Sequence, residues 1–147
     1  MVQPELSAQH LAESVRDHML KEDAVAKSLE MRFEGIGPGY AKLRMTVRGD
    51  MLNGFKNCHG GFITTLADTA FAYACNSHND VTVSSGLRMD FIAPVNEGNV
   101  LTAEAKEVCL FGRTGVYDVS VRNQDDQLIS VMRGNSYRLK GRHVVVI

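Results

Sequence analysis

The chain has few cysteines and no tryptophan among its 147 residues. Its three cysteines, Cys58, Cys75 and Cys109, are odd in number and lack CxxC spacing. This pattern indicates neither a disulfide framework nor a zinc site, so no metal site is expected. A reducing, cytoplasmic setting fits the unpaired thiols best.

The chain also lacks an excess of charge and any long hydrophobic run. Its net charge is −1, whereas a domain that binds nucleic acid normally presents a dominant basic face. The N-terminal sequence MVQPELSAQH has no basic start followed by an apolar core, and no apolar run is long enough to cross a bilayer. We therefore expect a soluble protein with neither nucleic acid nor a membrane as its partner.

The composition is that of one folded unit. Hydrophobic residues make up 44% of the chain and charged residues 22%, with no internal repeat or low-complexity tract. Residues 1–147 are therefore expected to form a single domain. Ser7 can cap a first helix, and the helical pattern over about 7–29 predicts an amphipathic brace or lid.

Most of the remaining chain has the pattern of β-strands. Met31 and Phe33 suggest a short strand, and the sequence GIGPGY after it is predicted to be a turn, since Pro38 and the absence of a following helix exclude a phosphate loop. The other predicted strands have apolar residues in alternation and short connections, at about 40–47, 81–92, 100–110, 115–122 and 128–139.

The stretch 53–79 contains the longest apolar segment. From Gly60 onward it predicts a helix of about four turns that is apolar over most of its circumference. One such helix and several antiparallel strands can bury both surfaces only if the sheet wraps the helix. The sequence therefore predicts the α+β class, with a long central helix wrapped by a curved antiparallel sheet.

Asp68 lies on a narrow polar stripe of this helix, together with three threonines. A charge on a buried helix is costly unless it is paired or used. Two interpretations stay open here. Asp68 hydrogen-bonds neighbouring hydroxyls or an arginine, or it faces a ligand or a second subunit that must come close.

The sequence His59-Gly60-Gly61 at the helix start favours the second interpretation. The N-terminus of a helix offers unpaired backbone N–H groups and a partial positive charge, and the two glycines let a substrate reach them. An oxyanion hole at the helix start and a carboxylate two turns along suit attack on a carbonyl. Cys58 and His59 do not form a plausible dyad, and there is no G-x-S-x-G elbow for a serine nucleophile.

Four segments together resemble the hotdog-fold acyl-CoA thioesterases, and closely the PaaI-type branch of phenylacetic acid degradation: MLNGFKNCHGG, LADTAFAYACNS, RMDFIAP and GRTGVYDV. The resemblance implies the hotdog fold, dimers with a continuous sheet, and commonly dimers of dimers. It implies hydrolysis of (aryl)acyl-CoA, such as phenylacetyl-CoA or hydroxylated derivatives, to the free acid and CoA. No cofactor is implied, because the coenzyme A thioester is the substrate.

The resemblance also assigns roles to residues. Asp68 would be the catalytic carboxylate, Gly60 the oxyanion donor, and Asn53 and His59 the groups that orient them. Gly60 and Asp68 would come from different subunits, so each active site would lie on a dimer interface. Whether Asp68 attacks directly or activates water stays open, and His59 could instead cap the helix.

Further residues would bind the substrate. Gly61 lies beside the oxyanion donor, and Ser84 or Ser85 matches a position that can hold the attacking water. Coenzyme A is polyanionic and needs basic side chains at a pocket mouth, for which Arg113 is the first choice and Lys140 the second. The acyl pocket would draw on the aromatic side of the helix and the loop before it. Phe55, Phe62 and Tyr73 are candidates for its walls or, equally, for plain core residues.

Two other functions use the same fold. In one, the pocket binds acyl-CoA without turnover, as a sensor or carrier. In the other, the protein is a dehydratase or hydratase, which would need a catalytic histidine in a different loop pattern. The retained Asp68 favours hydrolysis over both.

Overall fold

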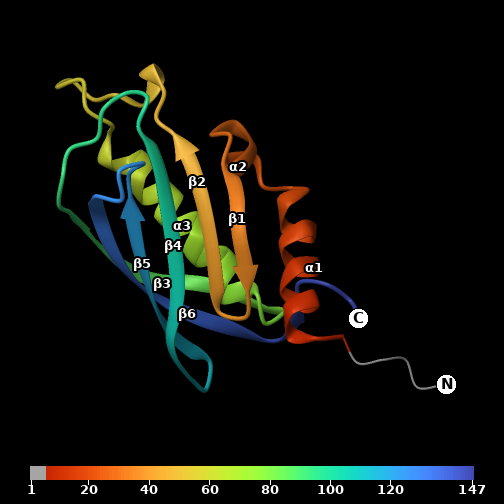
Figure 1. Cartoon of the computed structure of the whole chain (residues 1–147). Helices are drawn as coiled ribbons and strands as arrows, with labels where there is room; N and C mark the ends of the chain where they lie inside the picture. The colour runs from red at the N-terminus through yellow and green to blue at the C-terminus, as the bar shows by residue number, and fades with distance from the viewer. Residues whose placement is uncertain (1–5) are drawn as a thin grey trace.

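The computed structural model describes residues 6–147, which form three α-helices, one turn of 3-10 helix and six strands (Figure 1). The helices and the helical turn are α1 Ala8–Leu20, α2 Ala24–Ser28, η1 Gly49–Met51 and α3 Gly60–Asn76. The strands are β1 Arg32–Gly37, β2 Tyr40–Thr46, β3 Asp80–Phe91, β4 Val100–Phe111, β5 Thr114–Arg122 and β6 Leu128–His143. Within this part of the chain, no helix is long and apolar enough to span a membrane.

The six strands form one antiparallel sheet in the order β1-β2-β4-β5-β6-β3. Figure 1 shows the sheet curving around α3, with α1 beside the edge strand β1. Strand β3 forms the opposite edge and pairs only with β6 among the residues described. The predicted α+β arrangement, a long helix wrapped by a curved antiparallel sheet, is confirmed.

Small residues let α3 approach the sheet closely. Ala103 and Ala105 of β4 are fully buried beneath it, and Phe71 of α3 lies over Gly134 of β6, where a Cβ atom would come within 2.9 Å of the ring. This packing fixes one side of α3, which carries the buried residues Ile63, Leu66, Ala67, Ala70, Phe71, Tyr73 and Ala74. The opposite side, with the threonines and Asp68, is left only half-buried.

The segment 7–29 forms two helices that lie against β1 and the core. Ser7 caps α1, because its Oγ accepts a hydrogen bond from the backbone of His10 at 3.2 Å. Asp23 caps α2 through one carboxylate oxygen, and its other oxygen accepts a hydrogen bond from the hydroxyl of Tyr73 at 2.8 Å. This bond ties the N-terminal helices to α3.

One predicted turn is a strand instead. The sequence suggested that GIGPGY is a turn throughout, but Gly35–Gly37 belongs to β1 and only Pro38 and Gly39 form the turn. The reason is that Ile36 and Gly37 pair with β2, and a register shift after Phe33 accommodates the glycine. Among the three glycines of this stretch, only Gly39 takes a positive φ, of 66°.

Candidate active site

The loop before α3 is folded by the side chain of Asn53. Its Oδ1 accepts hydrogen bonds from the backbone N–H groups of Phe55 at 2.9 Å and Asn57 at 3.2 Å. The loop is closed by a backbone bond from Asn53 N–H to the carbonyl of Asn57. The amide nitrogen of Asn53 has no partner in residues 6–147 and remains available to a ligand.

His59 caps α3 and decides which N–H donor stays free. Its Nδ1 accepts a hydrogen bond from Gly61 N–H at 2.9 Å. Gly60 N–H makes no hydrogen bond within the described chain. The helix start therefore offers Gly60 as the open backbone donor, while Gly61 contributes its small size.

A cleft of about 400 Å³ opens at this end of α3; we call it the helix-start cleft. Phe91 of β3 forms one wall and packs on Gly60, where a Cβ atom would lie 2.9 Å from the ring. The cleft places the free donor of Gly60 beside the Asn53 loop. Its lining comes from the loop, α3 and the chain after β3: Asn53, Asn57, Cys58, Gly60, Ile63, Phe91, Ile92, Ala93, Pro94 and Val95.

Within residues 6–147, Asp68 has no hydrogen-bond or ion-pair partner. The neighbouring hydroxyls of Thr64, Thr65 and Thr69 donate instead to helix carbonyls four residues earlier, at 2.7 to 2.8 Å. Partial burial raises the pKa of the Asp68 carboxyl. An unpaired, half-buried carboxylate is disposed to act on something outside this chain.

Gly60 and Asp68 of one chain cannot act on the same carbonyl. Eight residues of α-helix span about 12 Å along the axis and turn the side chain by about 80°. An oxyanion donor must lie about 3 Å from the carbonyl oxygen, and a short aspartate side chain does not bridge the remaining distance.

The two serines of β3 have different environments. Ser84 pairs directly with Ser136 of β6, which is buried on the side of the sheet that faces α3. Because paired residues share a face, Ser84 points to the same side. Ser85 falls at a register shift and donates to the carbonyl of Asn135 at 3.2 Å. Of the two, Ser84 is the one placed toward the helix.

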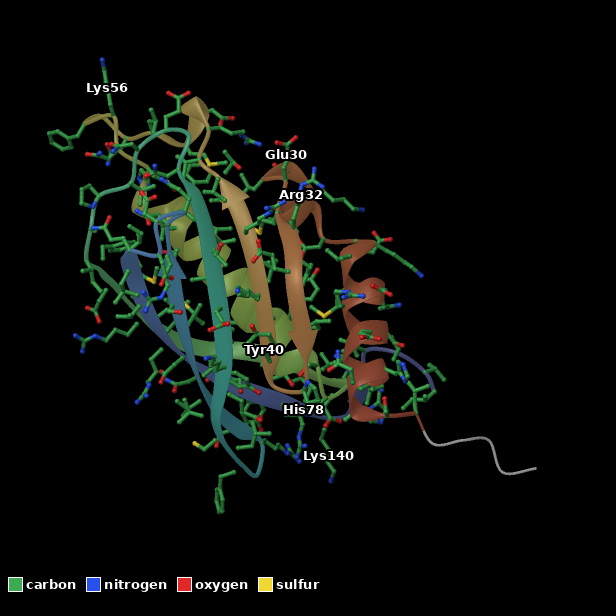
Figure 2. All side chains as sticks on the ribbon, in the orientation of Figure 1. Glu30, Arg32, Tyr40, Lys56, His78 and Lys140 are labelled. Atoms are coloured by element: carbon green, nitrogen blue, oxygen red, sulfur yellow. The ribbon has the colours of Figure 1, made fainter. Side chains whose placement is uncertain are left out.

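The candidate CoA-binding cations lie away from the helix-start cleft of the same chain. Arg113 is exposed in the turn between β4 and β5, 3.4 Å from the hydroxyl of Tyr137. Lys140 is exposed near the end of β6. Figure 2 shows Lys140 and His78 at one end of the molecule and Lys56, in the loop before α3, at the other. One chain therefore does not bring these cations to its own Gly60.

Arg113 lies instead at a second cavity, of about 240 Å³, which we call the helix-end pocket. It is bounded by the end of α3 and by residues of β3, β4, β5 and β6: Cys75, His78, Asp80, Thr82, Leu110, Gly112, Arg113, Thr114, Tyr117, Ser136 and Arg138. Motif spacing did not reveal this pocket, since its walls come from distant segments that meet only through strand register.

The expected aromatic walls are not gathered at either cavity. Phe55 is 88% exposed at the loop tip. Tyr73 is buried in the core, edge-on to Phe33 with ring centroids 4.7 Å apart, so of its two interpretations the core residue is the one that fits. Phe62 is partly buried and lies edge-on to His59.

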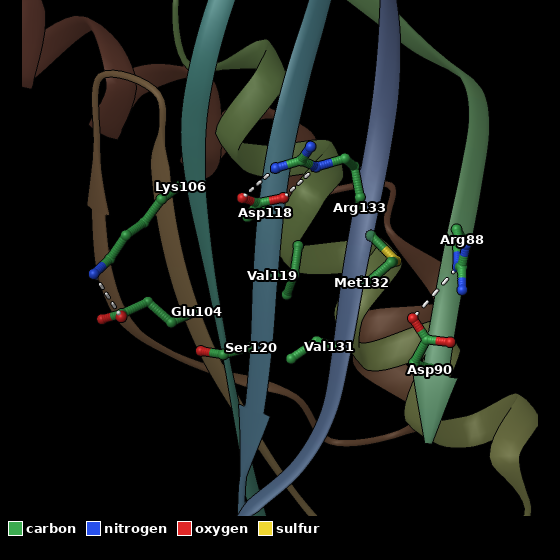
Figure 3. A pocket seen from close by; sticks show the side chains of 10 residues that line it. All are labelled: Arg88, Asp90, Glu104, Lys106, Asp118, Val119, Ser120, Val131, Met132 and Arg133. Carbon is green, nitrogen blue, oxygen red and sulfur yellow. Dashed lines mark hydrogen bonds and ion pairs between the residues drawn. The ribbon is translucent and has the colours of Figure 1, made fainter. Parts of the chain in front are cut away.

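A third hollow, of about 420 Å³, lies on the outer face of the sheet (Figure 3). Its charged side chains are paired with one another. Arg133 holds Asp118 through two hydrogen bonds of 2.7 and 2.9 Å, and this pairing lowers the pKa of Asp118. The other pairs are Arg88 with Asp90 and Lys106 with Glu104. None of the predicted site residues lines this hollow.

In the part of the chain that the structure describes, no cluster of three His, Cys, Asp or Glu side chains could hold a metal ion. Two groups of α3 lack a partner within the described residues, the N–H of Gly60 and the carboxylate of Asp68. A curved antiparallel sheet around one long helix, with a free N–H at the helix start and an unpaired carboxylate on its open side, defines a hotdog-fold protein equipped to attack a carbonyl.

The chain belongs to the thioesterase superfamily, whose sequence model matches residues 55–130. It is 43% identical to the acyl-coenzyme A thioesterase PaaI of Escherichia coli, over 84% of this chain and 88% of that protein. The structure of E. coli PaaI, from the phenylacetic acid degradation operon, superposes with a TM-score of 0.90 at 41% identity, over 92% of this chain and 99% of that one. A mutant of the phenylacetic acid degradation protein PaaI of Thermus thermophilus matches with a TM-score of 0.77 at 35% identity, over 80% and 100%. The chain is a thioester hydrolase.

Proposed function

We propose that this protein hydrolyses arylacyl-CoA thioesters, such as phenylacetyl-CoA or its hydroxylated derivatives, to the free acid and CoA. The observation that carries the proposal is the pair of unsatisfied groups on α3, the N–H of Gly60 and the carboxylate of Asp68. The similarity to PaaI, named an acyl-coenzyme A thioesterase and found in a phenylacetic acid degradation operon, supports this substrate class.

In the proposed mechanism the two groups act on different atoms of the thioester carbonyl. Gly60 N–H donates a hydrogen bond to the thioester oxygen and stabilises the negative charge that develops there. Asp68 either takes a proton from water, which then attacks the carbonyl carbon, or attacks that carbon itself and is released by water. In both routes the C–S bond breaks, CoA leaves as its thiol after protonation, and the oxygen of water ends in the acid.

His59 and Asn53 act by position. His59 occupies the Gly61 N–H and so fixes the first turn that presents Gly60. Asn53 holds the preceding loop through its Oδ1 and keeps its amide nitrogen free to orient the substrate. Ser84, on the helix-facing side of β3, is placed to hold the attacking water. None of these steps calls for a metal or a cofactor.

The active site is proposed to be shared between two subunits. The axial distance of about 12 Å between Gly60 and Asp68 requires the partner's Asp68 at each Gly60. The open edge of β3 exposes Val83 and Leu87 and offers unpaired backbone groups to a second sheet. Gly61 and Ala72 on the open side of α3 allow two helices to come close. This arrangement supports a dimer with a continuous sheet, and the resemblance to the PaaI-type thioesterases implies in addition a dimer of such dimers.

Arg113, at the helix-end pocket, and Lys140, at the end of the molecule opposite Lys56 (Figure 2), would then bind the phosphates of a CoA held across the interface. Such an enzyme acts in the cytoplasm, where its thiol product stays reduced. In the described residues, Cys58, Cys75 and Cys109 are all free thiols.

A panel of acyl-CoA esters, assayed by release of free thiol, tests the function. We expect arylacetyl-CoA esters to have a higher kcat/KM than acetyl-CoA or long-chain esters, and the Asp68→Asn variant to be nearly inactive. If every ester binds and none releases thiol, the alternative of a non-catalytic acyl-CoA-binding protein is correct. A strong preference for aliphatic esters would refute the arylacyl assignment while leaving the hydrolase.

A further inference from the structure

One hydroxyl of the helix-end pocket has no hydrogen-bond partner within residues 6–147. It belongs to Ser136, a residue that is only 2% exposed and lines the pocket. A ligand in the pocket can therefore form a hydrogen bond with it. Tyr117, fully buried, lies beside it in the same lining.

Gly115 creates the room in front of Ser136. A Cβ atom at Gly115 would lie 2.6 Å from the Ser136 hydroxyl, 2.8 Å from Leu110 and 3.1 Å from Tyr117, all of which line the pocket. Its φ lies outside the range that favours glycine, so backbone conformation does not explain the residue. Any side chain in its place would fill part of the cavity.

The pocket lies beyond the predicted catalytic carboxylate, Asp68, in the direction of the C-terminus of α3. Cys75 lines it and follows Asp68 by seven residues, which places the two on the same side of the helix, about 10 Å apart along the axis. Burial, together with the nearby charge of Asp68, raises the pKa of the Cys75 thiol to about 12. An acyl group whose carbonyl is held at Asp68 and whose far end runs toward the C-terminus of α3 would reach the pocket.

The charged groups around the pocket already have partners within the described residues. Glu107 accepts a hydrogen bond from Tyr117 at 3.3 Å and lies 3.1 Å from His78. Arg138 is paired with Asp80 at 3.2 Å, and the exposed Arg113 lies 3.4 Å from the hydroxyl of Tyr137. Ser136, by contrast, can both donate to and accept from a ligand hydroxyl.

We propose that the helix-end pocket receives the distal end of the acyl group and that Ser136 recognises a hydroxyl on its ring. This inference rests on the proposed arylacyl-CoA hydrolase activity and names the residue that would set its specificity. Ser136 is a specificity-determining residue and takes no part in bond breaking.

The test compares phenylacetyl-CoA with its 2-, 3- and 4-hydroxyphenyl counterparts. We expect the parent to have a higher kcat/KM for at least one hydroxylated ester than for phenylacetyl-CoA. Ser136→Ala should lower the ratio of these two kcat/KM values about five- to tenfold, the effect of one hydrogen bond of about 1 kcal/mol. Ser130→Ala is the matched control. Ser130 lies on the same face of β6, is fully buried and has an unpartnered hydroxyl, but does not line the pocket. The Ser130→Ala variant should have the same ratio of kcat/KM values as the parent.

A second variant separates the acyl group from coenzyme A. Gly115→Ala narrows the pocket, so it should lower kcat/KM for arylacetyl-CoA relative to acetyl-CoA, which has the same CoA portion. An equal loss with both esters, or weaker inhibition by free CoA, would mean that the pocket holds CoA and would overturn the proposal. An unchanged hydroxyl preference in Ser136→Ala would do the same.

A binding measurement keeps this inference distinct from the proposed function. Calorimetry with Asp68→Asn, alone and combined with Ser136→Ala, measures hydroxyl recognition whether or not the parent hydrolyses these esters. If no ester is hydrolysed but the preference depends on Ser136, the activity is wrong and the pocket assignment holds. If hydrolysis occurs and neither measurement depends on Ser136, the pocket assignment alone is refuted.

Discussion

Two inactive variants should restore activity to each other, because in the proposed active site Gly60 and Asp68 come from different subunits. The first variant, Asp68→Ala, lacks the carboxylate. The second, Gly60→Pro, lacks the N–H donor. Proline is well tolerated at the first position of a helix, which is where Gly60 lies in α3. A mixed dimer combines the intact Gly60 of one chain with the intact Asp68 of the other in one of its two sites.

The size of the recovery follows from counting sites. Half of the dimers formed by random mixing are mixed, and each has one complete site of two, so the mixture should reach about a quarter of parental activity. Mixed dimers purified through two different affinity tags should reach about half. If both groups acted within one chain, neither preparation would recover, because every chain carries one defect.

Gly60→Ala separates the loss of the donor from a steric effect. A Cβ at this position would lie 2.9 Å from the Phe91 ring in either variant, but alanine keeps its N–H. Phe91 is 54% exposed and its ring can turn aside. We expect Gly60→Ala to retain much more activity than Gly60→Pro. The assay is thiol release from an arylacetyl-CoA, with circular dichroism to show that each variant folds. No recovery from folded variants that have demonstrably exchanged subunits would refute the shared site.

Three further predictions concern single residues. Asp68→Asn should nearly abolish hydrolysis yet raise the melting temperature at pH 7, because a pKa raised by burial means that ionisation destabilises the fold. The gain in melting temperature should vanish below about pH 4, where the carboxyl is protonated in both folded and unfolded chains. Thermal melts at the two pH values check this. Arg113→Ala should raise KM for acyl-CoA several-fold with little change in kcat, and Lys140→Ala should have a smaller effect, as steady-state kinetics will show. Tyr73→Phe should lower the free energy of unfolding by about 1 kcal/mol, through loss of its hydrogen bond to Asp23, with unchanged kcat/KM; urea denaturation measures the first and thiol release the second.

The fold was largely predictable because its signals are local. The alternation over 40–47 places Ala41, Leu43 and Met45 in the core, where all three are at most 1% exposed. The continuous apolar character of 60–76 indicated the central helix, and its start is set by the His59 cap. The glycine-rich stretch after Phe33 was misread, because strand pairing with β2 overrode the turn preference of its residues.

The candidate site was predictable only in part. Asp68 stands out in the sequence because it is a lone charge on an apolar helix, and Gly60 because two glycines begin that helix. Neither Ser136 nor Gly115 carries such a signal, since each is an ordinary residue of an alternating strand. They become notable only when β5 and β6 place them directly opposite each other at the end of α3. Phe91 likewise meets Gly60 only through the path of β3.

Hydrogen bonds made by neighbouring residues determine which groups of α3 are left without a partner. The hydroxyl of each threonine on the open side donates its hydrogen bond to a helix carbonyl, so none of these hydroxyls donates to Asp68. His59 takes the N–H of Gly61, so one backbone donor at the helix start is left without a partner. A carboxylate left charged and a donor left free both cost stability, and the same packing that imposes this cost keeps the two groups about 12 Å apart in one chain. In the proposed shared site a second chain brings such groups to one carbonyl, so assembly and catalysis would depend on the same face of α3.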